Sequence, residues 1–178
     1  SHWEGRPDET RWYVERTAQE CTDLLDLIPL KERGERASLL ERRARVVLDY
    51  DVLPREPKAS FQDFGKIIKD INDAVKLAPK DPSLYHLRGW LYQNIDGDKM
   101  EKALLDNSEK DLRKACALVK QEKKSSREKG SNTWRVSEPT QDLRDTLHLL
   151  GKCLFRQKKH REAAAQLDEA LKMPWQLL

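Results

Sequence analysis

The sequence predicts an all-α fold of about seven helices. Apolar residues recur every three or four positions through most of its 178 residues, which is the spacing of one face of an α-helix. Prolines, turn residues and capping residues divide the chain into segments of ordinary helix length. No segment shows the alternation of apolar and polar residues that a half-buried strand requires. We therefore expect helices that pack on one another and no sheet.

Prolines, turns and capping residues set the boundaries of the expected helices. We expect them to begin near residues 8, 34, 61, 82, 99, 139 and 160. The first five should end near residues 28, 50, 77, 94 and 124, and a proline at 174 closes the last. Ser60 and Asp63 form a capping box for the third helix, while Asp81 and Pro82 suit the start of the fourth. The basic stretch 121–139 lacks apolar periodicity and is expected to be a mobile linker.

The first helix is expected to bury one apolar face and to have no counterpart in the rest of the chain. The residues of this face are Tyr13, Thr17, Cys21, Leu24 and Ile28. Residues 1–33 would then form an extra N-terminal helix that caps the others. The chain opens Ser1-His2-Trp3 without a methionine, which suggests a fragment of a longer protein that carries a tag remnant.

The composition indicates a soluble protein with heavily charged outer faces. Charged residues make up 37% of the chain and hydrophobic residues 38%, which is apolar enough for a core in a single domain, 1–178. No apolar run approaches the roughly 20 residues that span a bilayer, so we expect no membrane and a cytoplasmic or nuclear location. Cys21, Cys116 and Cys153 lie far from one another and from the histidines, which predicts three core thiols and no metal.

Three units of the chain share one pattern of small and large residues over two helices. The first helices read Leu40-x2-Arg43-Ala44-x2-Val47, Tyr85-x2-Arg88-Gly89-x2-Tyr92 and Leu147-x2-Leu150-Gly151-x2-Leu154. The second helices read Ile67-x3-Ile71-x2-Ala74, Ser108-x3-Leu112-x2-Ala115 and Ala163-x3-Leu167-x2-Ala170. We infer that Ala44, Gly89 and Gly151 are small so that the paired helix can approach closely.

These units resemble the tetratricopeptide repeat, whose pattern is W-x2-L-G-x2-Y, then A-x3-F and a closing proline. The resemblance covers 38–79, 82–120 and 143–175, with long insertions between the paired helices of the first two units. It implies an α-α superhelix of antiparallel helix pairs, in which the first helix of each pair lines a concave groove. The alternative is an ordinary helical bundle whose small residues coincide by chance.

The resemblance also implies a protein-protein interaction module, or adaptor, that binds a peptide or helix of a partner in the groove. The groove positions are Glu41, Arg45, Leu48, His86, Trp90, Gln93, His148, Lys152 and Phe155. Trp90 and Phe155 are the expected anchors, because large apolar groups outside the core are typical of binding hot spots. The alternative is that an insertion or the 121–139 segment covers them.

Some members of this family hold the C-terminal carboxylate of chaperones with lysine, asparagine and arginine side chains. The matching positions here are Arg45, Leu87, Asp145 and Leu149. Leucine and aspartate cannot grip a carboxylate, so the resemblance disfavours a chaperone tail as the ligand. Arg45 and Lys152 still suit an acidic peptide.

Other functions stay open from the sequence. The stretch 120–135 is basic and offers a contact for nucleic acid or a ribonucleoprotein, although a solvated linker is the favoured interpretation, because charge runs usually only solvate a chain. Its cations include Lys120, Lys123, Lys124, Arg127 and Lys129. The apolar ends of a short repeat array also suit self-association. No convergent set of acid, base and nucleophile occurs, so we expect neither catalysis nor a cofactor.

Overall fold

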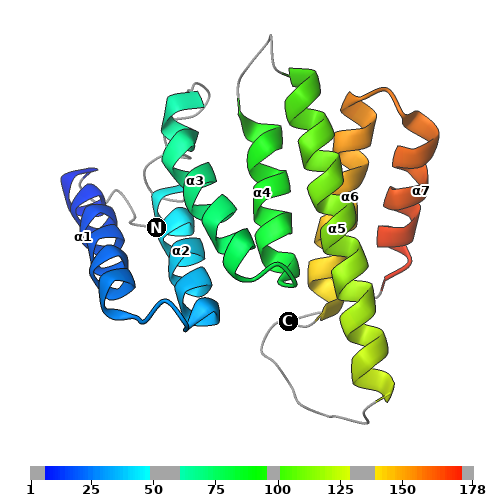
Figure 1. Cartoon of the computed structure of the whole chain (residues 1–178). Coiled ribbons are helices and arrows are strands. Elements are labelled where there is room, and N and C mark those ends of the chain that lie inside the picture. Colours follow the sequence, from blue (N-terminus) through cyan, green and yellow to red (C-terminus); the bar gives the residue numbers. More distant parts are fainter. Residues whose placement is uncertain (1–6, 49–60, 96–100, 129–138, 174–178) are drawn as a thin grey trace, which may run out of the picture. The chain divides into compact units, whose positions relative to one another are not determined.

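The computed structural model describes residues 7–48, 61–95, 101–128 and 139–173, and these ranges contain seven α-helices and no strand. The helices are α1 (Pro7–Leu27), α2 (Arg33–Val47), α3 (Phe61–Leu77), α4 (Pro82–Asn94), α5 (Glu101–Glu128), α6 (Pro139–Arg156) and α7 (His160–Leu171) (Figure 1). The predicted all-α fold and its number of helices are therefore confirmed for the described part of the chain.

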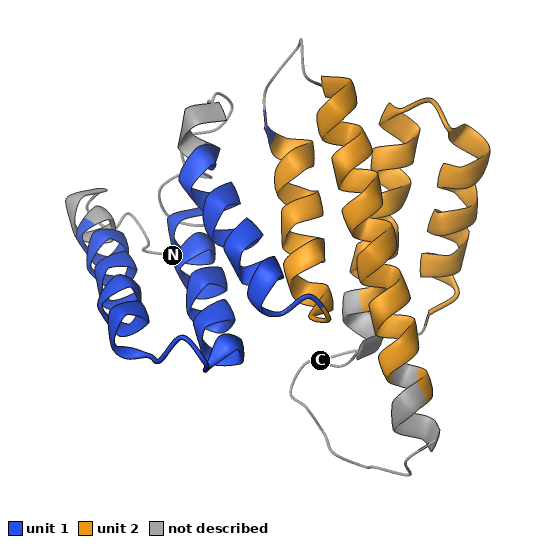
Figure 2. Cartoon of the chain, viewed as in Figure 1, with its two compact units in different colours: residues 1–79, 95–97 blue, residues 80–94, 98–178 orange. Residues whose placement is uncertain are grey.

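The helices form two compact units (Figure 2). The first comprises residues 1–79 and 95–97 and contains α1 to α3; the second comprises 80–94 and 98–178 and contains α4 to α7. Successive helices within a unit are antiparallel. In the first unit α2 packs against both α1 and α3, and in the second α5 packs against α4 and α6 while α6 also packs against α7.

Most helix boundaries agree with those predicted from the sequence. The backbone N–H of Ser83 donates to Asp81 Oδ1 at 2.9 Å, so Asp81 caps α4 as predicted. The predicted end of the fifth helix is wrong, because α5 continues to Glu128. Its last turns consist largely of Lys, Glu, Gln and Arg, which favour a helix even without an apolar face. The capping box at Ser60, the predicted end of the second helix near residue 50, and residues 129–138 lie outside the described residues.

The face that α1 turns toward α2 differs from the predicted one. Val14, Cys21 and Leu25 are buried, whereas Tyr13 is 64% and Leu24 45% exposed, so the prediction of these last two as core residues is wrong. The other two members of the predicted face are half-buried. The apolar residues of α1 cover a wider arc than α2 can bury, and the sequence alone does not say which part of that arc meets α2.

Arg36 of α2 fixes the C-terminal end of α1. Its Nη1 donates to the backbone carbonyl oxygen of Leu25 and, at 2.8 Å, to that of Ile28. The last carbonyl groups of a helix have no partner within the helix and carry the negative end of its dipole. The half-buried guanidinium of Arg36 therefore satisfies them and holds the two helices together.

One arginine-aspartate pair occurs at the same repeat position in both units. Arg43 Nε and Nη2 donate to the two carboxylate oxygens of Asp70 at 2.8 and 2.7 Å. Arg88 donates to Asp111 in the same way at 2.6 and 2.8 Å. Arg43 also donates to Thr22 Oγ1 of α1 at 2.8 Å. Each arginine precedes the small residue of its repeat, and the third repeat has a leucine and a glutamine in place of the pair.

The glycine of the second repeat lies directly against the paired helix. A methyl group built on Gly89 would lie 2.7 Å from Leu112 Cγ and 3.3 Å from the carbonyl oxygen of Ser108. Carbon atoms cannot approach so closely without displacing one another. Only a hydrogen atom fits at this point of α4.

The glycine of the third repeat makes the equivalent contact. A methyl group on Gly151 would lie 2.6 Å from Leu167 Cγ and 3.4 Å from the carbonyl oxygen of Ala163. Leu167 and Ala163 hold the repeat positions of the residues that meet the other glycine. The predicted close approach is therefore confirmed in both repeats, and Ala44 of the first repeat is fully buried as well.

The three cysteines are free and buried, as predicted. Burial raises the pKa of each thiol, to about 11 for Cys116. Such thiols stay protonated near neutral pH and are poor nucleophiles. Among the described residues, no three His, Cys, Asp or Glu side chains gather as metal ligands. No helix in these ranges is both long and apolar enough to cross a membrane.

Replacing Gly89 with alanine should lower the free energy of unfolding by about 1–3 kcal/mol, because the new methyl group must displace Leu112. The matched control is Gly65→Ala in α3, where a methyl group meets nothing within 4 Å. The control should be stabilised by about 0.5–1 kcal/mol through helix propensity. Urea denaturation followed by far-UV circular dichroism measures both. Equal stability of the two variants would contradict the close approach.

Replacing Asp111 with alanine should lower the free energy of unfolding by about 3 kcal/mol. The substitution removes the carboxylate from a buried ion pair and leaves the Arg88 charge buried. Asp73→Ala is the control, since Asp73 pairs with Lys76 on the surface of α3 at 2.8 Å. Exposed pairs of this kind contribute less than about 1 kcal/mol. The same denaturation experiment compares the two variants. Similar losses in the free energy of unfolding would show that burial of the ion pair does not govern its contribution to stability.

Candidate functional site

The first helices of the second and third repeats, α4 and α6, contact one another in unit 2. His86 Nδ1 lies 2.8 Å from Thr146 Oγ1, and Gln93 Nε2 donates to the carbonyl oxygen of Leu149 at 3.2 Å. Arg156 Nη1 donates to the carbonyl oxygen of Gln93 at 2.7 Å. These bonds fix the spacing of α4 and α6 along most of their length. We call the surface formed by α4 and α6 the α4–α6 face; it includes Trp90 and the exposed residues His148, Lys152 and Phe155.

Two of the predicted groove residues, His86 and Gln93, support the α4–α6 face. The imidazole of His86 is half-buried and bonds the fully buried Thr146. Gln93 Nε2 reaches into the core as well, donating to Ser108 Oγ at 3.1 Å, and that hydroxyl donates to the carbonyl oxygen of Gly89 at 2.8 Å. Both side chains thus join helices of the same unit, and we assign them a positioning role.

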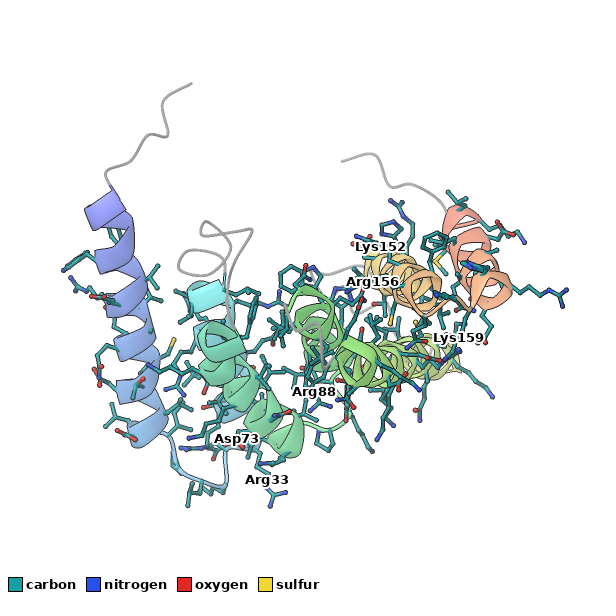
Figure 3. All side chains as sticks on the ribbon, turned by 90° about the horizontal axis from the view of Figure 1, so that it is seen from above. Arg33, Asp73, Arg88, Lys152, Arg156 and Lys159 are labelled. Atoms are coloured by element: carbon teal, nitrogen blue, oxygen red, sulfur yellow. The ribbon has the colours of Figure 1, made fainter. Side chains whose placement is uncertain are left out.

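Three other predicted residues form an exposed ridge on α6. His148, Lys152 and Phe155 are exposed, and their spacing of four and three places them on one side of the helix. Phe155 is 63% exposed, and its ring meets the ring of His160 edge-on with centroids 5.2 Å apart. Lys152 and Arg156, labelled in Figure 3, both project from α6. The ridge therefore combines an aromatic side chain with positive charge.

Trp90 lies on α4 between the two supporting residues. Its indole is half-buried, so it is neither sealed in the core nor fully open to solvent. The preceding residue is Gly89, which draws α4 close to α5. Of the two predicted anchors, Phe155 is thus the more accessible one.

The predicted groove residues of the first repeat belong to unit 1. Arg45 is exposed on α2 and donates to Glu41 Oε1 at 3.0 and 2.8 Å. Leu48 is fully buried, so its prediction as a groove residue is wrong. It follows Ala44 by four residues and therefore continues the buried side of α2.

The predicted basic segment begins on the last turns of α5. Lys120 Nζ pairs with Glu169 Oε1 of α7 at 2.8 Å, and Lys124 is exposed. The side chains of Lys123 and Arg127, and all of Lys129, lie outside the described residues. The described part of this segment thus includes one lysine that serves to join two helices of unit 2.

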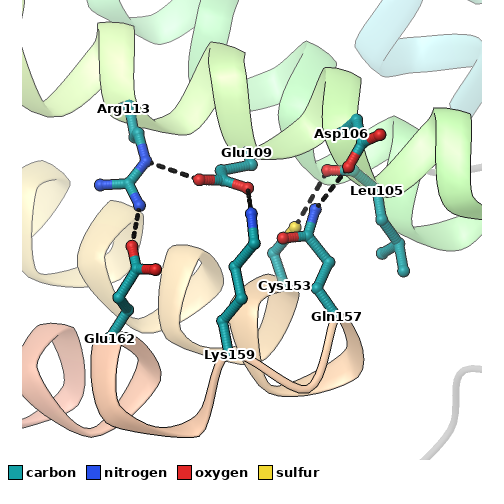
Figure 4. A network of polar contacts seen from close by, with 8 residues as sticks. All are labelled: Leu105, Asp106, Glu109, Arg113, Cys153, Gln157, Lys159 and Glu162. Atoms are coloured by element: carbon teal, nitrogen blue, oxygen red, sulfur yellow. Dashed lines mark hydrogen bonds and ion pairs between the residues drawn. The ribbon is translucent and has the colours of Figure 1, made fainter.

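A network of ion pairs joins α5 to the turn before α7 and its first turn (Figure 4). Glu109 accepts hydrogen bonds from Arg113 Nε at 2.8 Å and from Lys159 Nζ at 2.6 Å, and Arg113 Nη2 also donates to Glu162 at 2.6 Å. Burial acts to raise the pKa of Glu109, but the bonds from Lys159 and Arg113 outweigh it and hold that pKa below the ordinary value. The network stabilises α7 against α5.

The sequence interpretation did not identify this network. Only the spacing of four between Glu109 and Arg113 is visible in the sequence as a helical ion pair. Lys159 and Glu162 join it from distant positions, and pairing across helices depends on the fold. Thr146 was missed for the same reason, since its partner His86 lies on another helix.

Replacing Glu109 with glutamine should weaken the loss of stability in acid. The pKa of Glu109 is lowered by folding, so its stabilising contribution is present above the ordinary value of 4.5 and is lost as pH falls through the lower folded value. Urea midpoints measured between about pH 7 and pH 3 should therefore fall less for Glu109→Gln than for the wild type. Glu20→Gln, which alters an exposed pair on α1, is the control and should follow the wild type. Parallel curves for all three proteins would contradict the assignment.

No protein-family model matches the sequence, and no curated protein matches it. The internal repeat and the α4–α6 face are the features of the chain that indicate a function.

Proposed function

We propose that unit 2 is a tetratricopeptide-like interaction module and that its α4–α6 face binds a peptide or helix of a partner protein. The equivalent contacts of Gly89 and Gly151 with the paired helices support this relationship. In the tetratricopeptide pattern, the first helix of each pair lines the binding surface. Here those helices are α4 and α6. The proposed role is that of an adaptor, which acts by binding rather than by catalysis, in the cytoplasm or the nucleus.

The exposed ring of Phe155 is the observation that carries the proposal. A large apolar side chain on a rigid helix gains about 1.5–3 kcal/mol when a partner removes it from water. Aromatic residues in such positions dominate the binding energy of many interfaces. The edge-on contact with the His160 ring favours one orientation of Phe155, which lowers the entropy lost on binding.

The charge beside Phe155 indicates the chemistry of the partner. Lys152 lies on the same side of α6 and His148 one turn before it. A peptide with an apolar anchor and a neighbouring carboxylate suits this arrangement. A chaperone tail suits it less, because Leu87 is buried and Asp145 places a negative charge where a carboxylate would have to bind.

Replacing Phe155 with alanine should weaken partner binding at least about tenfold while leaving the helical circular dichroism unchanged. Leu171→Ala is the matched control, because Leu171 is 70% exposed on α7, outside the face. Lys152→Glu should weaken an acidic partner further. Tagged proteins would first be used to recover partners from extracts, and isothermal titration with the identified partner would then give the affinities.

A partner that binds Phe155→Ala and Lys152→Glu as tightly as the wild type would refute the α4–α6 face as its site. Trp90→Ala provides a separate check on the half-buried indole. It should reduce binding while the protein keeps most of its thermal stability. A variant that unfolds instead would assign Trp90 to the core.

A further inference from the structure

The turn between α6 and α7, together with the helix ends beside it, is strongly basic. The ten residues 152–161 include five lysine or arginine residues and no aspartate or glutamate, whereas the whole chain has a net charge of +3. All five cationic side chains are exposed. They belong to the last turns of α6, the connection and the first turn of α7. We call residues 152–161 the basic turn.

Three of the five cations have no ionic partner in the described part of the chain. Lys159 and Arg156 pair with glutamates of α5, at 2.6 and 3.0 Å. The others form neither an ion pair nor a side-chain hydrogen bond with a described residue; they are Lys152, Lys158 and Arg161. Positive charge therefore remains exposed on the basic turn.

Several of these cations occupy positions where another residue would stabilise the fold better. Lys158 has a φ of 63°, in the left-handed region where glycine is the usual residue at the end of a helix. Lys159 is the N-cap of α7 and makes no side-chain capping bond, which serine, threonine or aspartate can make. Arg161 adds positive charge at the positive end of the helix dipole. Such departures from the locally favoured residue are expected at functional sites.

The unpaired cations lie next to the exposed ring of Phe155. The backbone N–H of Lys158 donates to the carbonyl oxygen of Phe155 at 2.9 Å, so the chain folds back tightly at this point. Lys152 lies one turn before Phe155 on the same side of α6. Arg161 follows His160, whose ring contacts that of Phe155. Long, flexible cationic side chains can therefore reach a ligand that covers the ring.

A single apolar anchor with several cations beside it indicates an acidic protein segment as the ligand. A nucleic-acid strand is typically bound by cations and stacking rings that recur along a groove. Phe155 is the only phenylalanine, tyrosine or tryptophan between residues 139 and 173. A membrane surface would require several apolar side chains that insert together. A short peptide motif needs only one anchor and a few carboxylates placed beside it.

We infer that the basic turn binds a run of carboxylates next to the apolar anchor of the partner protein. This inference rests on the proposed function, because the anchor is the partner residue that covers Phe155. It adds a specificity requirement, namely consecutive aspartate or glutamate residues, and assigns their recognition to Lys152, Lys158 and Arg161. Side-chain carboxylates suffice, so the ligand needs no free C-terminus.

The experiment uses a fluorescein-labelled synthetic peptide with blocked ends, in which leucine is followed by a run of glutamates. A second peptide has glutamines in place of the glutamates. Fluorescence anisotropy with the whole chain should show at least about tenfold tighter binding of the glutamate peptide. Added salt should reduce this difference, because it screens exposed charges.

The double variant Lys158→Gly/Arg161→Glu separates binding from stability. It should weaken the glutamate peptide at least about tenfold and leave the glutamine peptide unchanged. Its urea midpoint should rise, because glycine suits the backbone at 158 and a carboxylate suits the N-terminal end of α7. Lys114→Glu is the matched control, since Lys114 is exposed on α5 outside the basic turn, and it should bind both peptides as the wild type does.

The outcomes distinguish this inference from the proposed function. Equal binding of the two peptides, or a glutamate preference that the double variant keeps, would overturn the inference. If Phe155→Ala still weakened both peptides, the anchor would stand without the basic turn. A glutamate preference that depends on Lys158 and Arg161 but survives Phe155→Ala would support the basic turn and refute the anchor. A labelled single-stranded oligonucleotide that binds more tightly than the glutamate peptide, and is lost in the double variant, would assign the basic turn to nucleic acid instead.

Discussion

The close approach of paired helices at two glycines is the constraint on which unit 2 depends. At Gly89 and Gly151 there is room for a hydrogen atom and for nothing larger, because Leu112 and Leu167 fill the space from the paired helix. Dense packing at these points sets the rotation of α4 and α6 about their own axes. That rotation decides which side chains enter the core and which, such as Phe155, stay exposed.

Polar contacts then fix the distances between helices, which apolar packing alone leaves adjustable. The bonds of His86 and Gln93 with α6 set the distance between the helices of the α4–α6 face. The Glu109 network holds α7 against α5. In unit 1, Arg36 and Arg43 act similarly on α1. Directional bonds of this kind restrict how far the helices can shift, and a surface held in this way loses little entropy when it binds.

The fold was largely predictable from the sequence because helix boundaries depend on local signals. Asp81, Pro82 and the three- and four-residue spacing of apolar side chains act within a turn or two, and the repeat places Gly89 and Gly151 correctly. The site was less predictable. The exposure of Tyr13 depends on how α1 is rotated, and the roles of His86 and Gln93 depend on partners from distant parts of the chain. Such choices are made by packing between helices, which local spacing does not encode.

The repeated arginine-aspartate pair has a consequence for the connecting segments. Arg43 with Asp70 and Arg88 with Asp111 adopt the same bidentate geometry, although different numbers of residues separate the members of each pair. The alignment of paired helices is thus carried by side chains, so the length of the connection is free to drift over evolution.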